Sequence, residues 1–94
     1  MFFRNPILNL STFEKRDRVT IFMDILKSTR DSRKGKKKTQ IIQSANLSHY
    51  QANKYLHLLL VNGLLFVDGE DRYRVTDRGA HFVKTLEALH LTLK

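Results

Sequence analysis

The sequence predicts a mainly α-helical fold that includes one small β-hairpin, an α+β class. Three observations predict it. Apolar residues recur at helical spacing in several segments, two short runs of strand-forming residues flank the turn signal Asp68-Gly69, and Ser-x-x-Glu and Ser-x-x-Gln capping boxes mark where helices begin. With 94 residues, 41% of them hydrophobic, the chain can fold around one core but not two.

The N-terminal arm, residues 1–14, is unusually apolar. Arg4, Asn5 and Pro6 interrupt it, so it lacks the unbroken apolar stretch of a signal peptide. No stretch of the chain approaches the roughly 20 apolar residues of a membrane span, so we expect no membrane partner. We expect the arm to pack on the domain or on a second copy of it. Its apolar residues are Phe2, Phe3, Ile7, Leu8, Leu10 and Phe13.

The first helix is expected to begin at Ser11, which together with Glu14 fits a capping box, or a few residues later near Asp17. It should end near Ser32, and Gly35 then lies in a connection where the backbone can turn. Apolar residues at helical spacing support this helix, namely Val19, Phe22, Met23, Ile25 and Leu26.

A short second helix and a tight turn follow. Thr39 is a suitable N-cap for a helix of about two turns, in which Ile41 and Ile42 face inward. Asn46 and Leu47 should form the turn, because asparagine tolerates the left-handed conformation and Leu47 can fill the angle between two helices.

Ser48 and Gln51 form the second capping box, so the third helix has a defined start. It should run to Asn62, with Gly63 as a left-handed C-terminal cap. At 100° per residue its side chains separate into two faces. The apolar face holds Ala52, Tyr55, Leu56, Leu59 and Leu60, and the polar face holds Tyr50, Asn53, Lys54 and His57.

Residues 64–67 and 72–75 are the two strands of the hairpin, and Asp68-Gly69 lies in the connection of about four residues between them. Thr76 should cap a last helix whose first turn holds Asp77. This helix carries one apolar stripe, made of Phe82, Leu86, Leu89 and Leu93.

This order of elements is that of a winged helix-turn-helix with an additional C-terminal helix. The predicted organisation is an apolar arm (1–14), a winged helix-turn-helix domain (15–76) and a C-terminal dimerisation helix (77–94). We expect the stripe of the last helix to be the interface of a homodimer, because it is too long for the small domain to cover. The alternative is that the N-terminal arm folds back over the stripe.

The charge of the chain points to nucleic acid. Seventeen Lys and Arg against nine Asp and Glu give a formal charge of +8. A helix-turn-helix on so basic a domain predicts binding to double-stranded DNA. The polar face of the third helix should enter the major groove, where Asn can pair with adenine and Lys can contact guanine or phosphate. The expected contacts of this helix are His49, Tyr50, Gln51, Asn53, Lys54 and His57.

A basic run extends from Lys27 to Lys38, opposed only by Asp31. It predicts a phosphate clamp with salt-sensitive binding, and the alternative is a solvated loop. In the hairpin, Arg72 and Arg74 point to the same side and suit phosphate contact, or else they pair with the acidic residues of the tip. The expected phosphate contacts are Arg33, Lys34, Lys36, Lys37, Lys38, Thr39, Arg72 and Arg74.

Other chemistry finds little support. The chain has no cysteine, and its four histidines show no metal-ligand spacing. It has no glycine-rich phosphate loop, no nucleophile motif and no close carboxylate pair on a common face. We therefore expect no enzyme activity, no catalytic residue, no metal, no cofactor and no small-molecule ligand.

Several motifs resemble those of a known family. They are Lys38-Thr39-x-Ile41-x-x-x-Ala45-Asn46-Leu47-Ser48, Lys54-Tyr55-Leu56, Asn62-Gly63-Leu64-Leu65 and Tyr73-x-x-Thr76-x-x-Gly79. Across about residues 17–85 the chain resembles the archaeal winged-helix DNA-binding proteins that include small basic chromosomal proteins of about 10 kDa. The resemblance implies a winged helix, a dimer formed through the C-terminal helix, and binding to double-stranded DNA.

We therefore predict a homodimeric winged-helix protein that binds double-stranded DNA, either as a chromatin-associated architectural protein or as a transcriptional regulator. Its expected location is the cytoplasm, in association with the nucleoid. Two alternatives are a winged helix used for protein–protein contact in a larger assembly and a winged helix that binds RNA.

Overall fold

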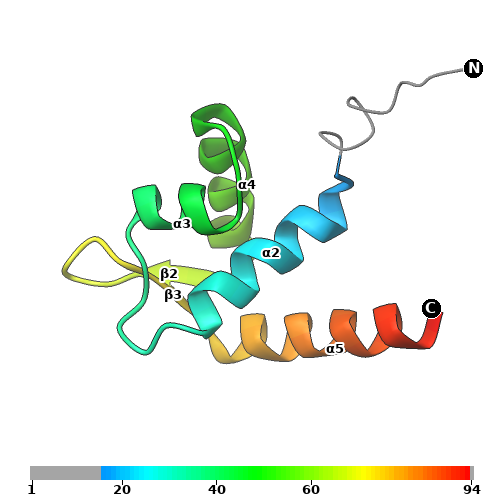
Figure 1. The fold of residues 1–94 in the computed structure, drawn as a ribbon. Coiled ribbons are helices and arrows are strands. Elements are labelled where there is room, and N and C mark those ends of the chain that lie inside the picture. Colours follow the sequence, from blue (N-terminus) through cyan, green and yellow to red (C-terminus); the bar gives the residue numbers. More distant parts are fainter. Residues whose placement is uncertain (1–15, 94) are drawn as a thin grey trace, which may run out of the picture.

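A computed structural model describes residues 16–93 of the chain, with side chains to Leu89, and confirms the α+β class and the predicted order of elements. The N-terminal arm and the Ser11 capping box lie outside the described residues. Figure 1 shows the elements in order: α2 (Arg18–Arg30), α3 (Lys38–Ser44), α4 (His49–Val61), β2 (Leu65–Val67), β3 (Tyr73–Val75) and α5 (Asp77–Leu93).

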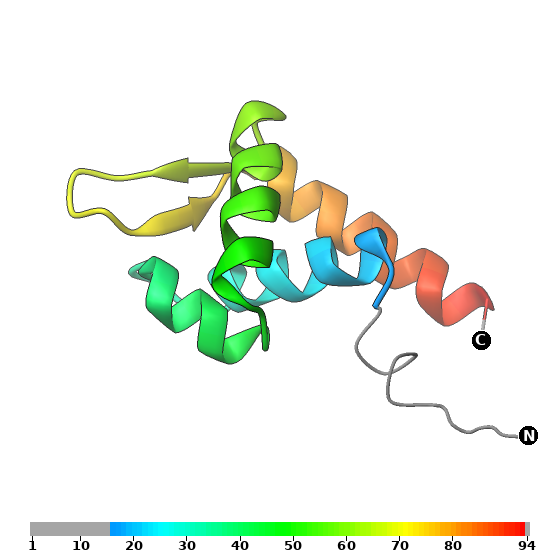
Figure 2. The ribbon, with the colours of Figure 1, turned by 90° about the horizontal axis from the view of Figure 1, so that it is seen from above.

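Helix α2 lies at the centre of the fold. Helices α3 and α4 pack on one side of it, and α5 runs along another side in the opposite direction (Figure 1). The hairpin of β2 and β3 projects from the end of the molecule where α2 finishes and α5 begins (Figure 2). Within residues 16–93, no helix combines the length and apolarity that crossing a membrane requires.

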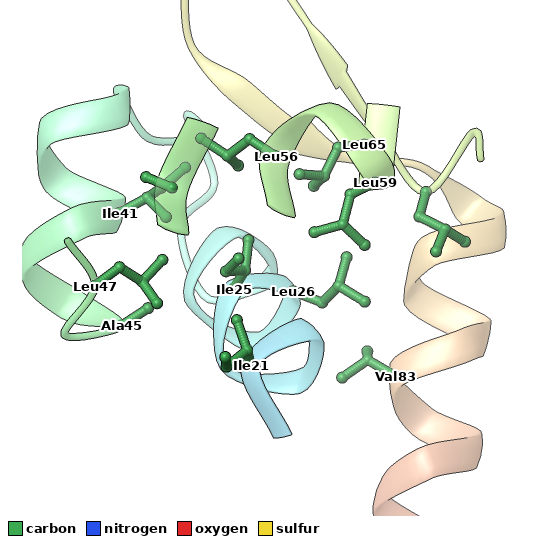
Figure 3. Packing of buried hydrophobic residues seen from close by; sticks show 12 residues of the cluster. Ile21, Ile25, Leu26, Ile41, Ala45, Leu47, Leu56, Leu59, Leu65 and Val83 are labelled. Atoms are coloured by element: carbon green, nitrogen blue, oxygen red, sulfur yellow. The ribbon is translucent and has the colours of Figure 1, made fainter. Parts of the chain in front are cut away.

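The core gathers where α2, α4 and α5 meet (Figure 3). Ile25 and Leu26 of α2 are fully buried, as is Val83 of α5. Val83 stands outside the stripe predicted for the last helix, and its burial turns that side of α5 toward α2. The remaining buried apolar residues are Ile21, Ile41, Ala45, Leu47, Ala52, Leu56, Leu59, Leu64 and Leu65.

The helix ends of α2 and α3 differ from prediction in detail. The Asp17 carboxylate accepts a hydrogen bond from the Thr20 amide at 2.7 Å, so α2 begins at the later of the two predicted starts. Thr39 is not the N-cap of α3, and that prediction was wrong. The N-cap is Lys37, two residues earlier, whose backbone N–H donates to the Gln40 side chain at 2.9 Å, so Thr39 lies inside the first turn.

The turn between α3 and α4 forms as predicted. Asn46 adopts a left-handed backbone with φ of 55°, and Leu47 is buried. The Ser48 hydroxyl and the Gln51 side chain each accept a hydrogen bond of 3.0 Å from the other's backbone N–H, which is a complete capping box. Helix α4 ends at Val61, and Gly63 follows with φ of 73°.

The hairpin pairs Leu65 with Val75 and Val67 with Tyr73 in antiparallel register. The predicted turn lies between the strands, and within it Asp71, rather than Gly69, adopts the left-handed backbone, with φ of 61°. The loop before α3 joins this small sheet through Lys36, whose backbone exchanges two hydrogen bonds with Tyr73, at 3.0 and 2.7 Å.

The connection from the hairpin to α5 is closely packed. The Thr76 hydroxyl accepts from the Gly79 amide at 2.9 Å, so Thr76 caps α5 as predicted. The same hydroxyl donates to the Gly63 carbonyl at 2.7 Å, which ties the end of α4 to the start of α5. A Cβ at Gly79 would lie 2.1 Å from the Leu64 carbonyl oxygen, so only glycine fits there.

Candidate nucleic-acid interface

The outer face of α4 presents polar side chains to solvent. Tyr50 is 75% exposed, and His49, Asn53, Lys54 and His57 are also exposed. The opposite face of the helix is buried in the core, so packing fixes which residues point outward. The outer face therefore has the composition that the sequence predicted, except that Gln51 is half-buried and its side chain is held in the capping box.

Contacts of the Tyr55 ring stabilise the side of this face that lies next to α2. Tyr55 is half-buried, and its ring meets Phe22 of α2 edge to face, with 5.5 Å between ring centroids. The Lys54 ammonium lies 5.4 Å from the centroid of the Tyr55 ring, a distance at which a cation–π attraction operates. The Lys54 side chain thus rests on a ring that the core holds in place.

Helix α3 contributes one side chain to the same face. The Lys38 ammonium donates a hydrogen bond to Oδ1 of Asn53 at 2.5 Å, joining the start of α3 to the second turn of α4. Lys38 and Asn53 were predicted to contact DNA separately, as a phosphate contact and a base contact. The structure brings them together.

The charges of the basic run, residues 27–38, point in different directions. Lys27 and Arg30 face α5 and lie 3.8 and 3.1 Å from the Glu87 carboxylate. Hydrogen bonding to Glu87 raises the pKa of Arg30, and hydrogen bonding to Arg30 lowers the pKa of Glu87. Lys36 turns inward and donates to the Ser28 hydroxyl of α2 at 3.1 Å.

Four cations of the run lie apart from these partners. Within residues 16–93, no carboxylate makes a salt bridge with Arg33, Lys34, Lys37 or Lys38. Arg33 and Lys34 lie at the tip of the α2–α3 loop, and Lys37 and Lys38 lie at the start of α3. We call these four the available cations; Lys38 among them reaches the outer face of α4 through Asn53.

The two arginines of the hairpin pair with acidic residues of its tip. Arg74 Nε lies 3.0 Å from Asp68 Oδ2, and Arg72 Nε lies 3.8 Å from the Glu70 carboxylate. Backbone N–H groups of Glu70 and Arg72 hydrogen-bond to Asp68 and, with Arg74, lower its pKa. The Arg–acid cluster that the sequence left open is therefore present, and a phosphate would have to compete with it.

The apolar stripe of α5 is partly covered. Phe82 packs against the core and Leu86 is half-buried, whereas Leu89 is 53% exposed and the side chain of Leu93 lies outside the described residues. Helix α2 covers more of α5 than the sequence predicted, because the two helices run side by side (Figure 1). Beside Phe82, a half-open apolar groove of about 560 Å³ is lined by Phe22, Leu58, Leu64 and the polar Arg78 and His81.

Within the described part of the chain, no three His, Cys, Asp or Glu side chains come together as metal ligands would.

Comparison with known proteins supports this assignment of elements. The family model described as winged helix-turn-helix matches residues 15–94. The crystal structure of Sso10a-2, a DNA-binding protein from Sulfolobus solfataricus, is similar with a TM-score of 0.64 and 26% identity, over 83% of this chain and 85% of that one. The O-methyltransferase NcsB1 of neocarzinostatin biosynthesis shares the fold alone, with a TM-score of 0.51 and 19% identity over 78% of this chain and 23% of that one. No curated protein sequence shows a significant match.

Proposed function

We propose that this chain, which belongs to the winged helix-turn-helix family, binds double-stranded DNA through the outer face of α4. The observation that carries the proposal is the exposure of Tyr50, Asn53, Lys54 and His57 on a helix whose other face is buried and whose start is fixed by a capping box. An exposed helix of this kind suits the major groove. The likeness to Sso10a-2, a DNA-binding protein, supports the same proposal.

The available cations provide positive charge that can attract DNA phosphates. Lys38 contacts Asn53 on this face, and no carboxylate pairs with Arg33, Lys34, Lys37 or Lys38 among the described residues. Lys and Arg that neutralise phosphates release counterions, which supplies affinity without sequence preference. We assign phosphate contact to these four and to Thr39 in the first turn of α3, and we place base contact on Asn53 and Lys54.

The test separates base contact from phosphate contact. Asn53→Ala and Lys54→Ala should each lose roughly 1–3 kcal/mol of binding free energy on the preferred duplex and less on random duplex DNA. Leu60→Ala is the control, because Leu60 packs against the core on the opposite face of α4 and should affect unfolding rather than base preference. Equal losses on both duplexes would reassign Asn53 and Lys54 to phosphate contact.

Competition among nucleic acids tests the class of ligand. Labelled duplex DNA is challenged with unlabelled duplex DNA, single-stranded DNA and double-stranded RNA, and only the duplex DNA should compete well. Preferential competition by RNA would favour an RNA-binding winged helix. Absence of binding to every nucleic acid at low salt would favour a protein–protein contact role instead.

We also propose that two copies pair through α5. Val19, at the start of α2, and Leu89, near the end of α5, are 48% and 53% exposed at the same end of the antiparallel helix pair. The groove beside Phe82 adds further uncovered apolar surface, and exposed surface of this kind commonly marks an interface. A second copy would place two α4 helices on one duplex.

Sedimentation of matched variants tests the dimer. Leu86→Glu combined with Leu89→Glu should give a monomer that binds DNA weakly, because the two sites are no longer linked. Lys84→Glu is the control, since it changes the net charge by the same amount at an exposed position of α5 off the apolar stripe. A monomeric unmodified protein at high micromolar concentration would contradict the dimer and leave the DNA-binding proposal standing.

The role we assign is that of a nucleoid-associated protein in the cytoplasm, of the architectural or the regulatory kind. Footprinting on a random duplex pool separates these two kinds. Protection of discrete sites identifies a regulator, and even protection identifies a chromosomal protein of the small basic type.

A further inference from the structure

The contact between Lys38 and Asn53 has a consequence for base preference. A lysine ammonium carries three donors and no acceptor, so the Asn53 atom that faces it must be the carboxamide oxygen. The amide nitrogen of Asn53 is then directed away from Lys38. In this arrangement the pair exposes N–H donors of both groups, and the one lone pair left on the Asn53 oxygen lies beside a positive charge.

This arrangement changes which base the pair suits. Bidentate pairing of asparagine with adenine uses the amide oxygen to accept from N6 and the amide nitrogen to donate to N7. With the ammonium already at that oxygen, an adenine amino group would have to donate to the second lone pair and bring its own partial positive charge next to the ammonium. Guanine presents N7 and O6, which are both acceptors. A surface made of donors matches guanine better than adenine.

We propose that Lys38 is a positioning residue that fixes the hydrogen-bond polarity of Asn53 and thereby makes α4 prefer guanine over adenine at the base pair that Asn53 contacts. This inference rests on the proposed function. Lys38 lies on α3, so the residue at this position of α3 influences which base α4 prefers.

The geometry supports a stable link between the two side chains. Lys38 lies in the first turn of α3 and is half-buried, which limits the directions its chain can take. Ser48 caps α4 one turn before Asn53, so the backbone of Asn53 is fixed relative to α3 by the intervening tight turn. Within residues 16–93 no carboxylate pairs with Lys38, so nothing described draws the ammonium away from Asn53.

The experiment measures equilibrium affinity of the full chain for duplexes in which each base pair of the preferred site is exchanged in turn. The base pair at which Asn53→Ala removes the preference identifies the Asn53 contact. At that base pair the unmodified protein should favour guanine. Lys38→Met should shift the ratio of adenine to guanine affinities toward adenine by about 5- to 150-fold, the range expected of one bidentate contact.

Lys37→Met is the matched control, because it removes the same charge from the neighbouring residue and leaves Asn53 and its partner in place. It should weaken all duplexes by one factor and leave the ratio unchanged. Asn53→Ala in the Lys38→Met background should abolish the shift, which excludes a general rearrangement of α3.

Three results would overturn the inference: an even loss across all duplexes for Lys38→Met, a preference of the unmodified protein for adenine at the Asn53 contact, or no base pair whose preference depends on Asn53. Failure of the unmodified chain to bind any duplex would overturn the proposed function as well. Thermal unfolding of Lys38→Met should match that of the unmodified protein, which confirms that the readout is recognition and not folding.

Discussion

The salt dependence of DNA binding tests which cations reach the phosphates. The chain has a formal charge of +8, but among its charged side chains we assign phosphate contact only to the four available cations of the basic run, with which no carboxylate pairs among residues 16–93. Each phosphate neutralised on duplex DNA contributes about −0.9 to the slope of log affinity against log salt. Four contacts therefore give a slope of about −3.6 for each bound protomer. The four cations are Arg33, Lys34, Lys37 and Lys38.

Two variants, each of which removes one positive charge, test this prediction. Lys37→Ala should make the slope shallower by about 0.9, since it removes one phosphate contact. Lys27→Ala removes the same charge from the other end of the basic run, where Lys27 pairs with Glu87 of α5. Its slope should equal that of the unmodified protein.

The assay is fluorescence anisotropy of a labelled duplex at several salt concentrations. A slope near zero for the unmodified protein would refute electrostatic binding altogether. Equal changes of slope for Lys27→Ala and Lys37→Ala would refute the division of the basic run, because both charges would then contribute through net charge alone.

Three further predictions concern the fold that holds the interface. Gly79→Ala should lower the free energy of unfolding by about 1–3 kcal/mol or more, because the new Cβ would lie 2.1 Å from the Leu64 carbonyl oxygen; an unchanged urea midpoint would contradict this. Ser48→Ala should cost about 1 kcal/mol in the same measurement through loss of the α4 cap, and Ser48→Gly should cost only a few tenths. Arg30 lowers the pKa of Glu87, so the stabilising pair is complete at neutral pH and is lost as acid protonates Glu87 below the ordinary glutamate range. The stability gap between the unmodified protein and Glu87→Gln should therefore close in acid, and a gap that persists there would contradict the pairing.

Local patterns in the sequence were sufficient to predict the elements and their order. Asn46 is left-handed because its side chain tolerates that conformation, and Ser48 and Gln51 form their capping box from residues three apart. These features depend on neighbouring residues alone. The cap of α3 was missed because Gln40 reaches back to Lys37, and a glutamine three residues after a lysine carries no usual capping signal.

Features that depend on residues distant in sequence were not predictable in the same way. Val83 is fully buried although it lies outside the apolar stripe predicted for α5, because α2 packs against that side of α5. The tip of the hairpin places Asp71 in the left-handed region, where the Asp68 side chain accepts from two backbone amides and holds the turn. Gly69, the residue that usually supplies such a conformation, is then not needed for it.

The electrostatics of the candidate interface follow from these distant pairings. Glu87 lies 57 residues from Arg30 in sequence, and no local sequence pattern predicts that the two side chains pair. This pairing directs Arg30 of the basic run toward α5. In the hairpin, Asp68 pairs with Arg74 in the same way. Some cations of the basic run and the hairpin therefore have carboxylate partners, while Lys38 has a partner, Asn53, that the charge pattern does not predict. A basic composition accordingly supports nucleic-acid binding in general, whereas the choice of bases depends on how α3 and α4 pack, since packing decides which donors and acceptors remain exposed.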